Sequence, residues 1–319
     1  MKMTSENKNI IPIAFAFDEN LILPAEIAIC SLLQHAKETT YYQIYVLHGS
    51  DTDLSGFETD TIKKNYPHCD IVFKNVGDAF QTAFEIRDIT IPAYYRLLIP
   101  EIIQEHDKIL YSDVDVIFRA DLSEFYNNIE LDDAYVAGVD SLAQFDKDTR
   151  LYYEKNLGIS AKGIIYSGNL IINSKKMREN GIVHRFMEHA QKQYRFQDMD
   201  IINLVCAEHI KYLEPSFCVS TYFTDYALHQ RKALNAFWTE REINEALQNG
   251  IVHYNGQKPW KGYCVNFDIW WEYYRKSPFF DAKFYFDFFY SRLNEYDLLP
   301  LWKRIKILIR YFVYGRKAM

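Results

Sequence analysis

The sequence has few of the residues and motifs that mark several common classes of protein. Its five cysteines are scattered without a Cys-x-x-Cys pair, which fits buried thiols in a reducing compartment better than disulfides or a zinc site. Its 12 glycines form neither Gly-x-Gly-x-x-Gly nor Gly-x-x-x-x-Gly-Lys-Ser/Thr. This weakens a nicotinamide-dinucleotide or P-loop interpretation, so any nucleotide binding must depend on side chains and a metal ion.

Long hydrophobic runs are also missing. No uncharged apolar segment reaches the roughly 20 residues that a membrane-spanning helix needs. Residues 1–9 contain no apolar region of the kind found in signal peptides. We therefore expect a cytoplasmic protein.

Positive charge is scarce except near the carboxyl end. The chain carries 36 basic and 43 acidic residues, a net charge of −7. Residues 301–319 hold six of the basic residues and none of the acidic ones, so the rest has 30 against 43, or −13. Such an acidic body argues against nucleic-acid binding, and the basic tail predicts an anionic partner for that tail.

Strand-like and helix-like segments alternate through the first part of the 319-residue chain. Buried strands are expected at residues 11–17, 42–47 and 71–73, and helices at 21–35 and 54–66. This alternation predicts an α/β fold, and the length allows either one large domain or a domain with an appendage. In such sheets ligands collect at the carboxyl ends of the strands.

Two aspartates, Asp113 and Asp115, interrupt the apolar stretch of residues 108–118. Two carboxylates at the end of a buried strand repel each other and lose hydration, and a divalent cation between them removes both problems. The pair therefore indicates a site for a hard metal of the Mg or Mn kind. Taken alone, an Asp-x-Asp tripeptide is more often a solvated turn.

A second polar motif follows about 140 residues later. A short β-branched run leads to His253, and Gly256 and Lys258 come within the next five positions. A neutral imidazole completes a carboxylate-bound metal site, the glycine allows close approach of an anion, and the lysine is a charge for phosphate. Each residue alone has an ordinary structural explanation, but together with the aspartates they predict a metal-diphosphate site.

These motifs resemble those of the retaining, metal-dependent glycosyltransferases of family 8. That family includes bacterial lipopolysaccharide galactosyl- and glucosyltransferases and glycogenin. The resemblance covers nearly the whole chain, and four ordered segments carry it: Ile11-Pro-Ile-Ala-Phe-Ala-Phe-Asp18-Glu-Asn20, Pro92-Ala-Tyr-Tyr-Arg96-Leu, Asp107-Lys-Ile-Leu-Tyr-Ser-Asp113-Val-Asp115 and His253-x-x-Gly256-x-Lys258-Pro-Trp260.

The resemblance implies a fold, a reaction and partners. The fold is GT-A, a Rossmann-like nucleotide-diphospho-sugar transferase fold with a mixed central sheet flanked by helices. The reaction is transfer of a hexose from UDP-galactose or UDP-glucose to a glycan or glycolipid such as lipopolysaccharide, with Mn²⁺ or Mg²⁺ as cofactor. The alternatives are a catalytically weakened UDP-sugar-binding relative and a sugar-nucleotide hydrolase.

The resemblance also implies roles for individual residues. It assigns the metal to Asp113, Asp115 and His253. Residues with catalytic or sugar-orienting roles would be Arg96, Asp140 and Asp198. Residues that contact the nucleotide or its diphosphate would be Asp18, Asn20, Asp113, Val114, Gly256 and Lys258.

Three positions depart from the family pattern. Leu21 stands where a tyrosine often stacks on the base, and Tyr166 replaces an asparagine, which leaves a donor other than galactose or glucose open. Met199 replaces a glutamine whose amide lies under the anomeric carbon. This removes an amide-based covalent route and favours attack by the acceptor from the same face.

The carboxyl-terminal third predicts two further parts after a catalytic domain of residues 1–265. Residues 266–298 are rich in aromatics, which either pack helices onto the sheet or form an acceptor platform. Residues 299–319 place apolar and basic side chains on opposite faces of a helix. Such a helix either docks on the protein's own core or lies on the anionic inner surface of a membrane, and the absence of acidic residues favours the membrane.

Overall fold

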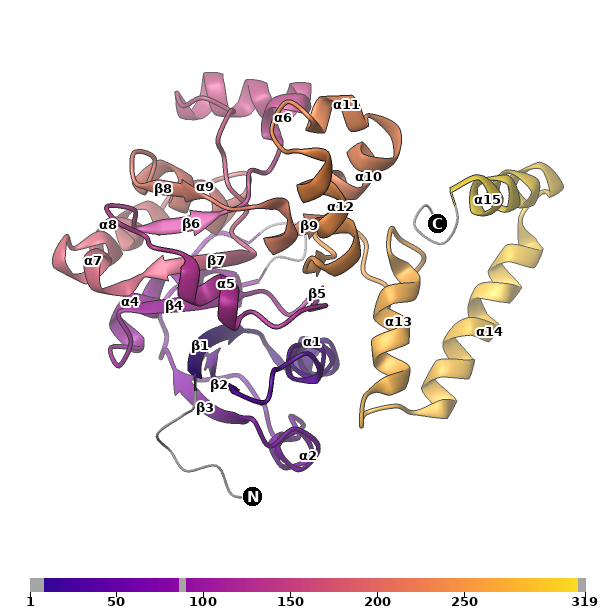
Figure 1. The fold of residues 1–319 in the computed structure, drawn as a ribbon, viewed down its shortest axis with the longest axis horizontal. Helices are drawn as coiled ribbons and strands as arrows, with labels where there is room; N and C mark the ends of the chain where they lie inside the picture. The colour runs from indigo at the N-terminus through magenta and orange to yellow at the C-terminus, as the bar shows by residue number, and fades with distance from the viewer. Residues whose placement is uncertain (1–8, 86–89, 315–319) are drawn as a thin grey trace.

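The centre of the fold is a seven-stranded sheet in the order β3-β2-β1-β4-β7-β6-β8 (Figure 1). The computed structural model describes residues 9–85 and 90–314. The strands run parallel from β3 to β4, whereas β7 is antiparallel to both of its neighbours. The predicted mixed sheet is thereby confirmed. Its strands are β1 (Asn9–Ala16), β2 (Thr40–His48), β3 (Cys69–Asn75), β4 (Lys108–Ser112), β6 (Val136–Gly138), β7 (Asn169–Asn173) and β8 (Ile210–Tyr212).

Strand β1 lies in the interior of this sheet, between β2 and β4, and both of its faces are apolar. Ile13 is paired with Ile44 of β2 and with Leu110 of β4. A strand that is buried on both faces reads as a continuous hydrophobic run, which is why it could be located from the sequence. Helix α1 (Ile22–Gln34) follows it and confirms the predicted helix at 21–35.

A small second sheet joins distant parts of the chain. It consists of β5 (Val116–Ile117), β10 (Val252–His253) and β9 (Val219–Ser220), with β10 in the middle. Within it, His253 lies opposite Val116 of β5 and Ser220 of β9. The pairing of β10 with β5 therefore brings His253 next to the segment that follows Asp115.

Helices surround the two sheets (Figure 1). Those between the strands are mostly short, and the longest one lies near the carboxyl end of the chain. After α1 they are α2 (Thr59–Asn65), α3 (Pro92–Tyr95), α4 (Ile99–Ile102), α5 (Ser123–Asn128), α6 (Lys147–Leu151), α7 (Ser174–Glu179), α8 (Ile182–Ala190), α9 (Gln197–Val205), α10 (Thr221–His229), α11 (Arg231–Leu234), α12 (Glu240–Asn249), α13 (Phe267–Lys276), α14 (Ala282–Leu298) and α15 (Leu301–Tyr314).

The sequence predicts one helix over residues 91–103, and the structure divides it. A single turn of 3-10 helix, Arg96–Leu98, separates α3 from α4. Pro100 stands in the first turn of α4, where its missing N–H does no harm, whereas in the middle of one long helix it would remove a backbone hydrogen bond. The chain is therefore helical from Pro92 to Ile102, as predicted, but it changes to 3-10 geometry at Arg96–Leu98.

Two other predicted elements are shorter than expected. The family resemblance implies a strand over residues 164–173, but it is regular only in β7, and its first part is joined to the sheet by one isolated bridge between Asp140 and Ile165. The helix over residues 54–66 begins only at Thr59. Residues 164–168 instead bend towards the functional site described below.

The aromatic helix α13 packs on the α/β body. Trp270, Trp271 and Tyr274 are buried, and they share one hydrophobic cluster with Ile27 of α1 and Ile117 of β5. The packing interpretation of this aromatic segment is confirmed for α13. Helix α14 adds Phe288 to the cluster from its inner side, while its outer side exposes several large apolar residues, namely Phe286, Tyr290, Leu293 and Leu298.

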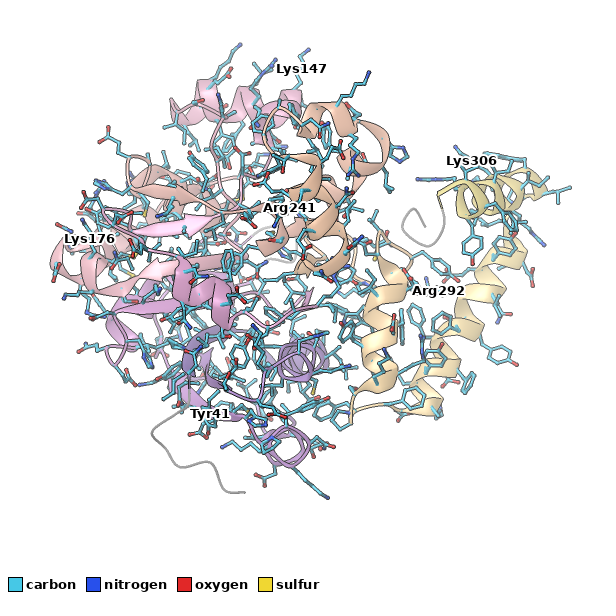
Figure 2. All side chains as sticks on the ribbon, in the orientation of Figure 1. Tyr41, Lys147, Lys176, Arg241, Arg292 and Lys306 are labelled. Atoms are coloured by element: carbon cyan, nitrogen blue, oxygen red, sulfur yellow. The ribbon has the colours of Figure 1, made fainter. Side chains whose placement is uncertain are left out.

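Helix α15 extends beyond the body together with α14, and Lys306 marks its position in Figure 2. Its apolar stripe is exposed to solvent: Leu301 is 72% exposed and Phe312 is 79% exposed. The alternative in which this helix docks on the protein's own core is therefore wrong. Among the helices of the described residues, none combines the length and hydropathy required to cross a bilayer.

Candidate active site

The side chains of Asp113, Asp115 and His253 converge between the two sheets, and we refer to them as the metal cluster. One potential ligand atom from each lies within 4.8 Å of the others. The Nε2 atom of His253 is 3.5 Å from Asp113 Oδ2 and 3.3 Å from Asp115 Oδ1. The Tyr254 amide donates a hydrogen bond to the Asp115 carbonyl (2.9 Å), which fixes β10 against the aspartates.

Gly168 forms one wall of the metal cluster. Its carbonyl accepts a hydrogen bond from the Asp113 amide at 2.7 Å. A Cβ atom at this position would lie 2.3 Å from His253 Cε1 and 2.7 Å from Asp113 Oδ2, both closer than non-bonded atoms can approach. The space between the imidazole and the carboxylate therefore exists only because residue 168 has no side chain.

Three cationic side chains surround the two carboxylates. The Arg96 Nη2 donates to Asp113 Oδ1 at 2.8 Å, and its Nη1 donates to the Ser167 carbonyl at 2.6 Å. Lys258 forms an ion pair with Asp115. His253 is the third: burial lowers its pKa, but the two carboxylates raise it well above the usual value, so the ring carries a proton that must leave before Nε2 can bind a metal ion. The carboxylates are thus neutralised by protein groups, which the sequence alone did not indicate.

These contacts determine the ionisation of the two carboxyl groups. Burial raises the pKa of Asp115, but the charges of Lys258 and His253 outweigh it and hold that pKa well below its usual range. Burial likewise raises the pKa of Asp113, and the guanidinium of Arg96 reverses the effect, so the net shift is downward. Both groups are therefore anionic at neutral pH, the form in which carboxylates bind cations.

The donor set fits a hard divalent metal. Two carboxylates and one imidazole are ligands that Mn²⁺ and Mg²⁺ accept, and a thiolate set that would select zinc or copper is missing from this described group. The Nδ1 atom of His253, on the far side of the ring, lies 3.5 Å from Cys218 Sγ. Such an outer contact fixes the ring orientation, and no sequence signal pointed to Cys218.

Asp198 lies beside the metal cluster, in the first turn of α9. Its Oδ2 is 3.2 Å from the Nε of Arg96, so one arginine connects Asp113 and Asp198. Burial raises the pKa of Asp198 to about 6, although Arg96 opposes the shift. The structure therefore brings together two of the three predicted catalytic residues, Arg96 and Asp198.

The third predicted catalytic residue, Asp140, follows β6, where its backbone is bridged to Ile165. The predicted nucleotide-binding residues lie on other segments. Asp18 and Asn20 follow β1, where Asp18 accepts hydrogen bonds from the Asn20 amide (3.0 Å) and the Thr90 hydroxyl (3.2 Å). The side chain of Val114 is buried in the main hydrophobic core, so only its backbone remains for a nucleotide contact. Gly256 has open space where a Cβ would stand, with only Thr221 Oγ1 at 3.9 Å.

The positions that depart from the family pattern are packed. Tyr166 is buried, and its ring meets that of His253 edge to face at 6.5 Å. Met199 is partly buried against an apolar cluster that includes Tyr153 and Ile164. Leu21 packs on the main core. The methionine therefore fills space as a core residue does.

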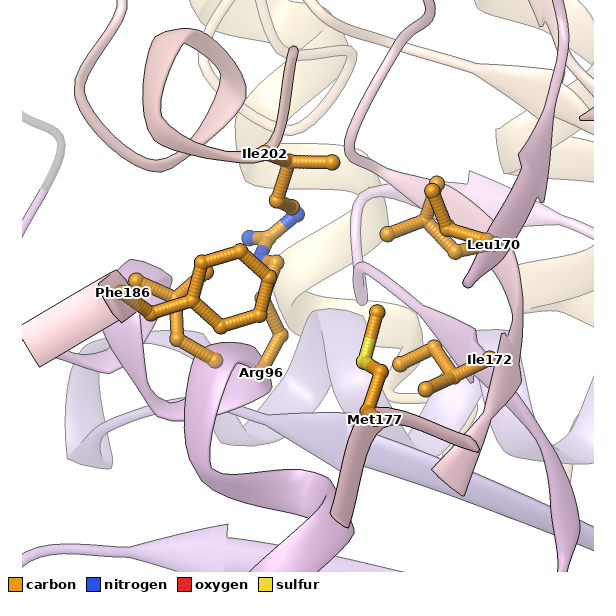
Figure 3. A pocket seen from close by; sticks show the side chains of 8 residues that line it. Arg96, Leu170, Ile172, Met177, Phe186 and Ile202 are labelled. Atoms are coloured by element: carbon orange, nitrogen blue, oxygen red, sulfur yellow. The ribbon is translucent and has the colours of Figure 1, made fainter. Parts of the chain in front are cut away.

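A small cavity behind Arg96 is not a ligand site. Its volume is about 10 Å³, and apart from the arginine its lining is apolar. Figure 3 shows Phe186 beside Arg96, and Ile172 and Met177 across the cavity. This volume is at the lower limit for one water molecule, and the apolar walls offer it few partners. The position of Arg96 is therefore set by its ion pairs with Asp113 and Asp198 and not by a ligand in this cavity.

Comparisons of the sequence identify relatives in bacteria. The model of the family described as "Glycosyl transferase family 8" matches residues 12–264. General stress protein A of Bacillus subtilis is 25% identical over 243 residues, which are 72% of this chain and 80% of that protein. The lipopolysaccharide 1,2-glucosyltransferase of Escherichia coli is 22% identical and covers 86% of this chain and 80% of its own.

Glycosyltransferase GlyE of Streptococcus pneumoniae is 26% identical over 82% of this chain, which spans only 60% of GlyE.

Solved structures of other glycosyltransferases have the same fold as this chain. Galactosyltransferase LgtC in complex with donor and acceptor sugar analogs superposes with a TM-score of 0.65 at 21% identity, over 86% of this chain and 98% of LgtC. The bifunctional glycosyltransferase WbbM gives a TM-score of 0.68 at 21% identity, over 89% of this chain and 52% of WbbM. The neighbours confirm the predicted GT-A fold, and the match to the family model over most of the sequence shows that the chain belongs to glycosyl transferase family 8.

Proposed function

We propose that this glycosyltransferase moves a hexose, galactose or glucose, from a UDP-sugar to a hydroxyl group of a cell-surface glycan or glycolipid, with retention at the anomeric carbon. The observation that supports it most is the convergence of Asp113, Asp115 and His253 within 4.8 Å, with Lys258 paired to Asp115. The family membership and the name of the E. coli relative support a cell-surface acceptor such as lipopolysaccharide.

In this proposal the chain's residues divide the work on the donor. Asp113, Asp115 and His253 would hold Mn²⁺ or Mg²⁺, which supplies positive charge for the departing diphosphate. Lys258 moves from its carboxylate partner to the phosphates, and the backbone at Gly256 allows their close approach. Asp18 and Asn20 contact the uridine at the end of β1.

The sugar lies on the side of Arg96 and Asp198. The bond between the anomeric carbon and the UDP oxygen breaks, the acceptor oxygen bonds to that carbon from the same face, and its proton passes to the departing phosphate. Arg96 orients the donor sugar and its phosphate, and Asp198, fixed by Arg96, holds a sugar hydroxyl. Because Met199 carries no amide, the chain offers no nucleophile at the position that the family glutamine would occupy.

Thermal unfolding with UDP, UDP-glucose or UDP-galactose, each with and without Mn²⁺, tests this proposal. A ligand that binds only the native state raises the melting temperature, so we expect the largest rise when a UDP-sugar and Mn²⁺ are present together. No rise with any of these ligands would contradict the donor class. Product analysis with candidate acceptors then distinguishes transfer from hydrolysis of the donor. Hydrolysis remains an alternative because Met199 and Tyr166 depart from the family pattern.

We also propose that the protein attaches reversibly to an anionic inner-membrane surface through α15. The exposed apolar stripe and the basic residues Lys303, Lys306 and Arg310 support this attachment. Each basic residue near an anionic surface adds roughly 1 kcal/mol. In this proposal residues 1–265 form the catalytic domain, 266–298 connect it to the tail, and 299–319 bind the membrane surface of a cytoplasmic protein.

A further inference from the structure

A second hollow lies at the end of β6, and we refer to it as the β6 cavity. Its volume is about 430 Å³, within the range of small-molecule sites. It is formed where β8, the turn at residues 162–163 and the segment between α11 and α12 meet. The lining residues that matter here are Asp140, Lys162, Gly163, Tyr212, Phe237 and Trp238.

The β6 cavity is close to the metal cluster but separate from it. Asp140 is bridged to Ile165, and Gly168, three residues further along, forms the wall of the metal cluster. Three residues span at most about 11 Å between Cα atoms, even when fully extended. A donor sugar held at the cluster would therefore lie within reach of a ligand in the cavity.

The aromatic walls of this cavity are fixed by neighbouring residues. The ring of Trp238 packs on Phe223 at 5.6 Å, and that of Phe237 packs on Phe145 at 5.4 Å. The hydroxyl of Tyr212 donates to the Gly163 carbonyl at 3.1 Å. Although Tyr212 is therefore held in place, it is 57% exposed, so its ring presents a large apolar face to a ligand.

The polar groups of the cavity suit hydroxyl groups. The backbone amides of Leu142 (to Oδ1, 2.7 Å) and Gly163 donate to the Asp140 carboxylate, which has about four acceptor positions and so keeps some for a ligand. Lys162 is exposed beside it and offers donors. Aromatic faces for C–H groups, together with a carboxylate and an ammonium for hydroxyls, are the complement of a pyranose ring.

The other aromatic-rich part of the molecule offers no such surface near the metal cluster. Trp270, Trp271 and Tyr274 of α13 are buried in the packing against α1 and β5. An acceptor platform on these residues would require the helix to leave the body. Tyr212, Phe237 and Trp238 instead line an open hollow, and Tyr212 is 57% exposed.

We propose that the β6 cavity binds a hexopyranose unit of the acceptor glycan. Tyr212 and Trp238 provide stacking surfaces, and the Asp140 carboxylate accepts hydrogen bonds from the hydroxyl groups of the sugar. This inference rests on the proposed transferase function. It adds the place at which the acceptor binds and the class of sugar unit recognised there.

The test is saturation-transfer NMR on the full chain with UDP and Mn²⁺. The probes are the methyl α- and β-pyranosides of glucose, galactose, mannose and N-acetylglucosamine. We expect at least one of them to bind, and Tyr212→Ala to weaken it by about tenfold through loss of one stacking face. UDP affinity in Mn²⁺ should stay within about twofold, because the nucleotide site is separate.

The matched control is Phe286→Ala on α14, which removes an aromatic ring with the same 57% exposure away from the cavity. It should leave hexoside binding unchanged. Trp238→Phe is the second variant, since it keeps a ring in the packing against Phe223. We expect this variant to lower hexoside affinity less than Tyr212→Ala does, and to leave the melting temperature of the protein unchanged.

Three outcomes would overturn the assignment. The first is that none of the hexosides binds. The second is that binding is unaffected in both Tyr212→Ala and Trp238→Phe. The third is that UDP binding falls together with hexoside binding in these variants, which would show that the cavity belongs to the donor-binding site. Failure of the unchanged chain to bind UDP with Mn²⁺ would refute the transferase proposal, and that measurement is independent of the hexoside signal.

Discussion

The metal cluster and the C-terminal arm, which consists of α14 and α15, place charged and apolar groups in opposite ways. Around the cluster, ionised side chains are withdrawn from water, and Arg96 and Lys258 are paired with carboxylates. On the arm, large apolar side chains such as Trp302 and Phe312 are exposed. Buried charge costs free energy unless it is paired, and a large exposed apolar surface marks a site of interaction. The comparison therefore separates a region prepared for a small charged ligand from one prepared for a large apolar surface.

The largest effect is expected for removal of a charge from the metal cluster. Asp115→Asn takes away a hard ligand and the partner of Lys258, so UDP release from the donor should fall at least about 100-fold in Mn²⁺. The same substitution at Asp133, whose side chain is 92% exposed, should leave the rate unchanged. Full activity of Asp115→Asn would contradict the assignment of a metal site to this cluster.

A change of shape at the cluster, without a change of charge, should have the next largest effect. Gly168→Ala places a methyl group against His253 and Asp113, so we expect metal affinity to fall about 10- to 100-fold, as when outer contacts of a metal site are lost. Calorimetric titration with Mn²⁺ measures it. The control is Gly56→Ala, whose new methyl group meets only Ile22 Cδ1 at an ordinary 3.5 Å. Equal Mn²⁺ affinity in both variants would show that the cluster does not need the space.

Loss of the lysine should affect the nucleotide more than the metal. Lys258→Ala removes one charge-assisted contact to the diphosphate, so UDP affinity in Mn²⁺ should fall about tenfold. Lys261→Ala, at an exposed position three residues later, is the matched control. If both variants bind UDP as the unchanged chain does, Lys258 serves only as a partner of Asp115.

The smallest effect is expected on the arm, where many weak contacts share the binding. Lys306→Ala should weaken sedimentation with anionic vesicles about fivefold at low salt, since one charge near such a surface contributes roughly 1 kcal/mol. Lys283→Ala on α14, whose side chain is 85% exposed, is the control. Vesicle binding that ignores lipid charge, or that persists in a chain ending at Leu298, would contradict a role for α15.

The sequence located the parts of the fold that depend on local pattern. The run from Ile11 to Phe17 is apolar on both faces, so its strand could be recognised without knowledge of its neighbours. Asp113, Asp115 and His253 could be assigned to one site because carboxylates at strand ends and a later histidine share a ligand chemistry. The structure brings these three side chains together.

Contacts between distant segments were beyond such reasoning. Arg96 reaches Asp113 from a segment 17 positions away, and Gly168 has its role only once the segment before β7 lies against His253. The exposure of the α15 stripe could not be predicted either, since an amphipathic pattern is the same whether a helix packs on a core or on a membrane. These features depend on tertiary contacts that no short window of residues contains.

The pairing of β5 with β10 also has a consequence for synthesis of the chain. Asp115 and His253 are separated by 138 positions, and closing a loop of that length costs conformational entropy before any contact offsets it. A chain still on the ribosome carries the two aspartates long before the histidine is translated. A nascent chain therefore cannot bring all three side chains of the metal cluster together until His253 has been made.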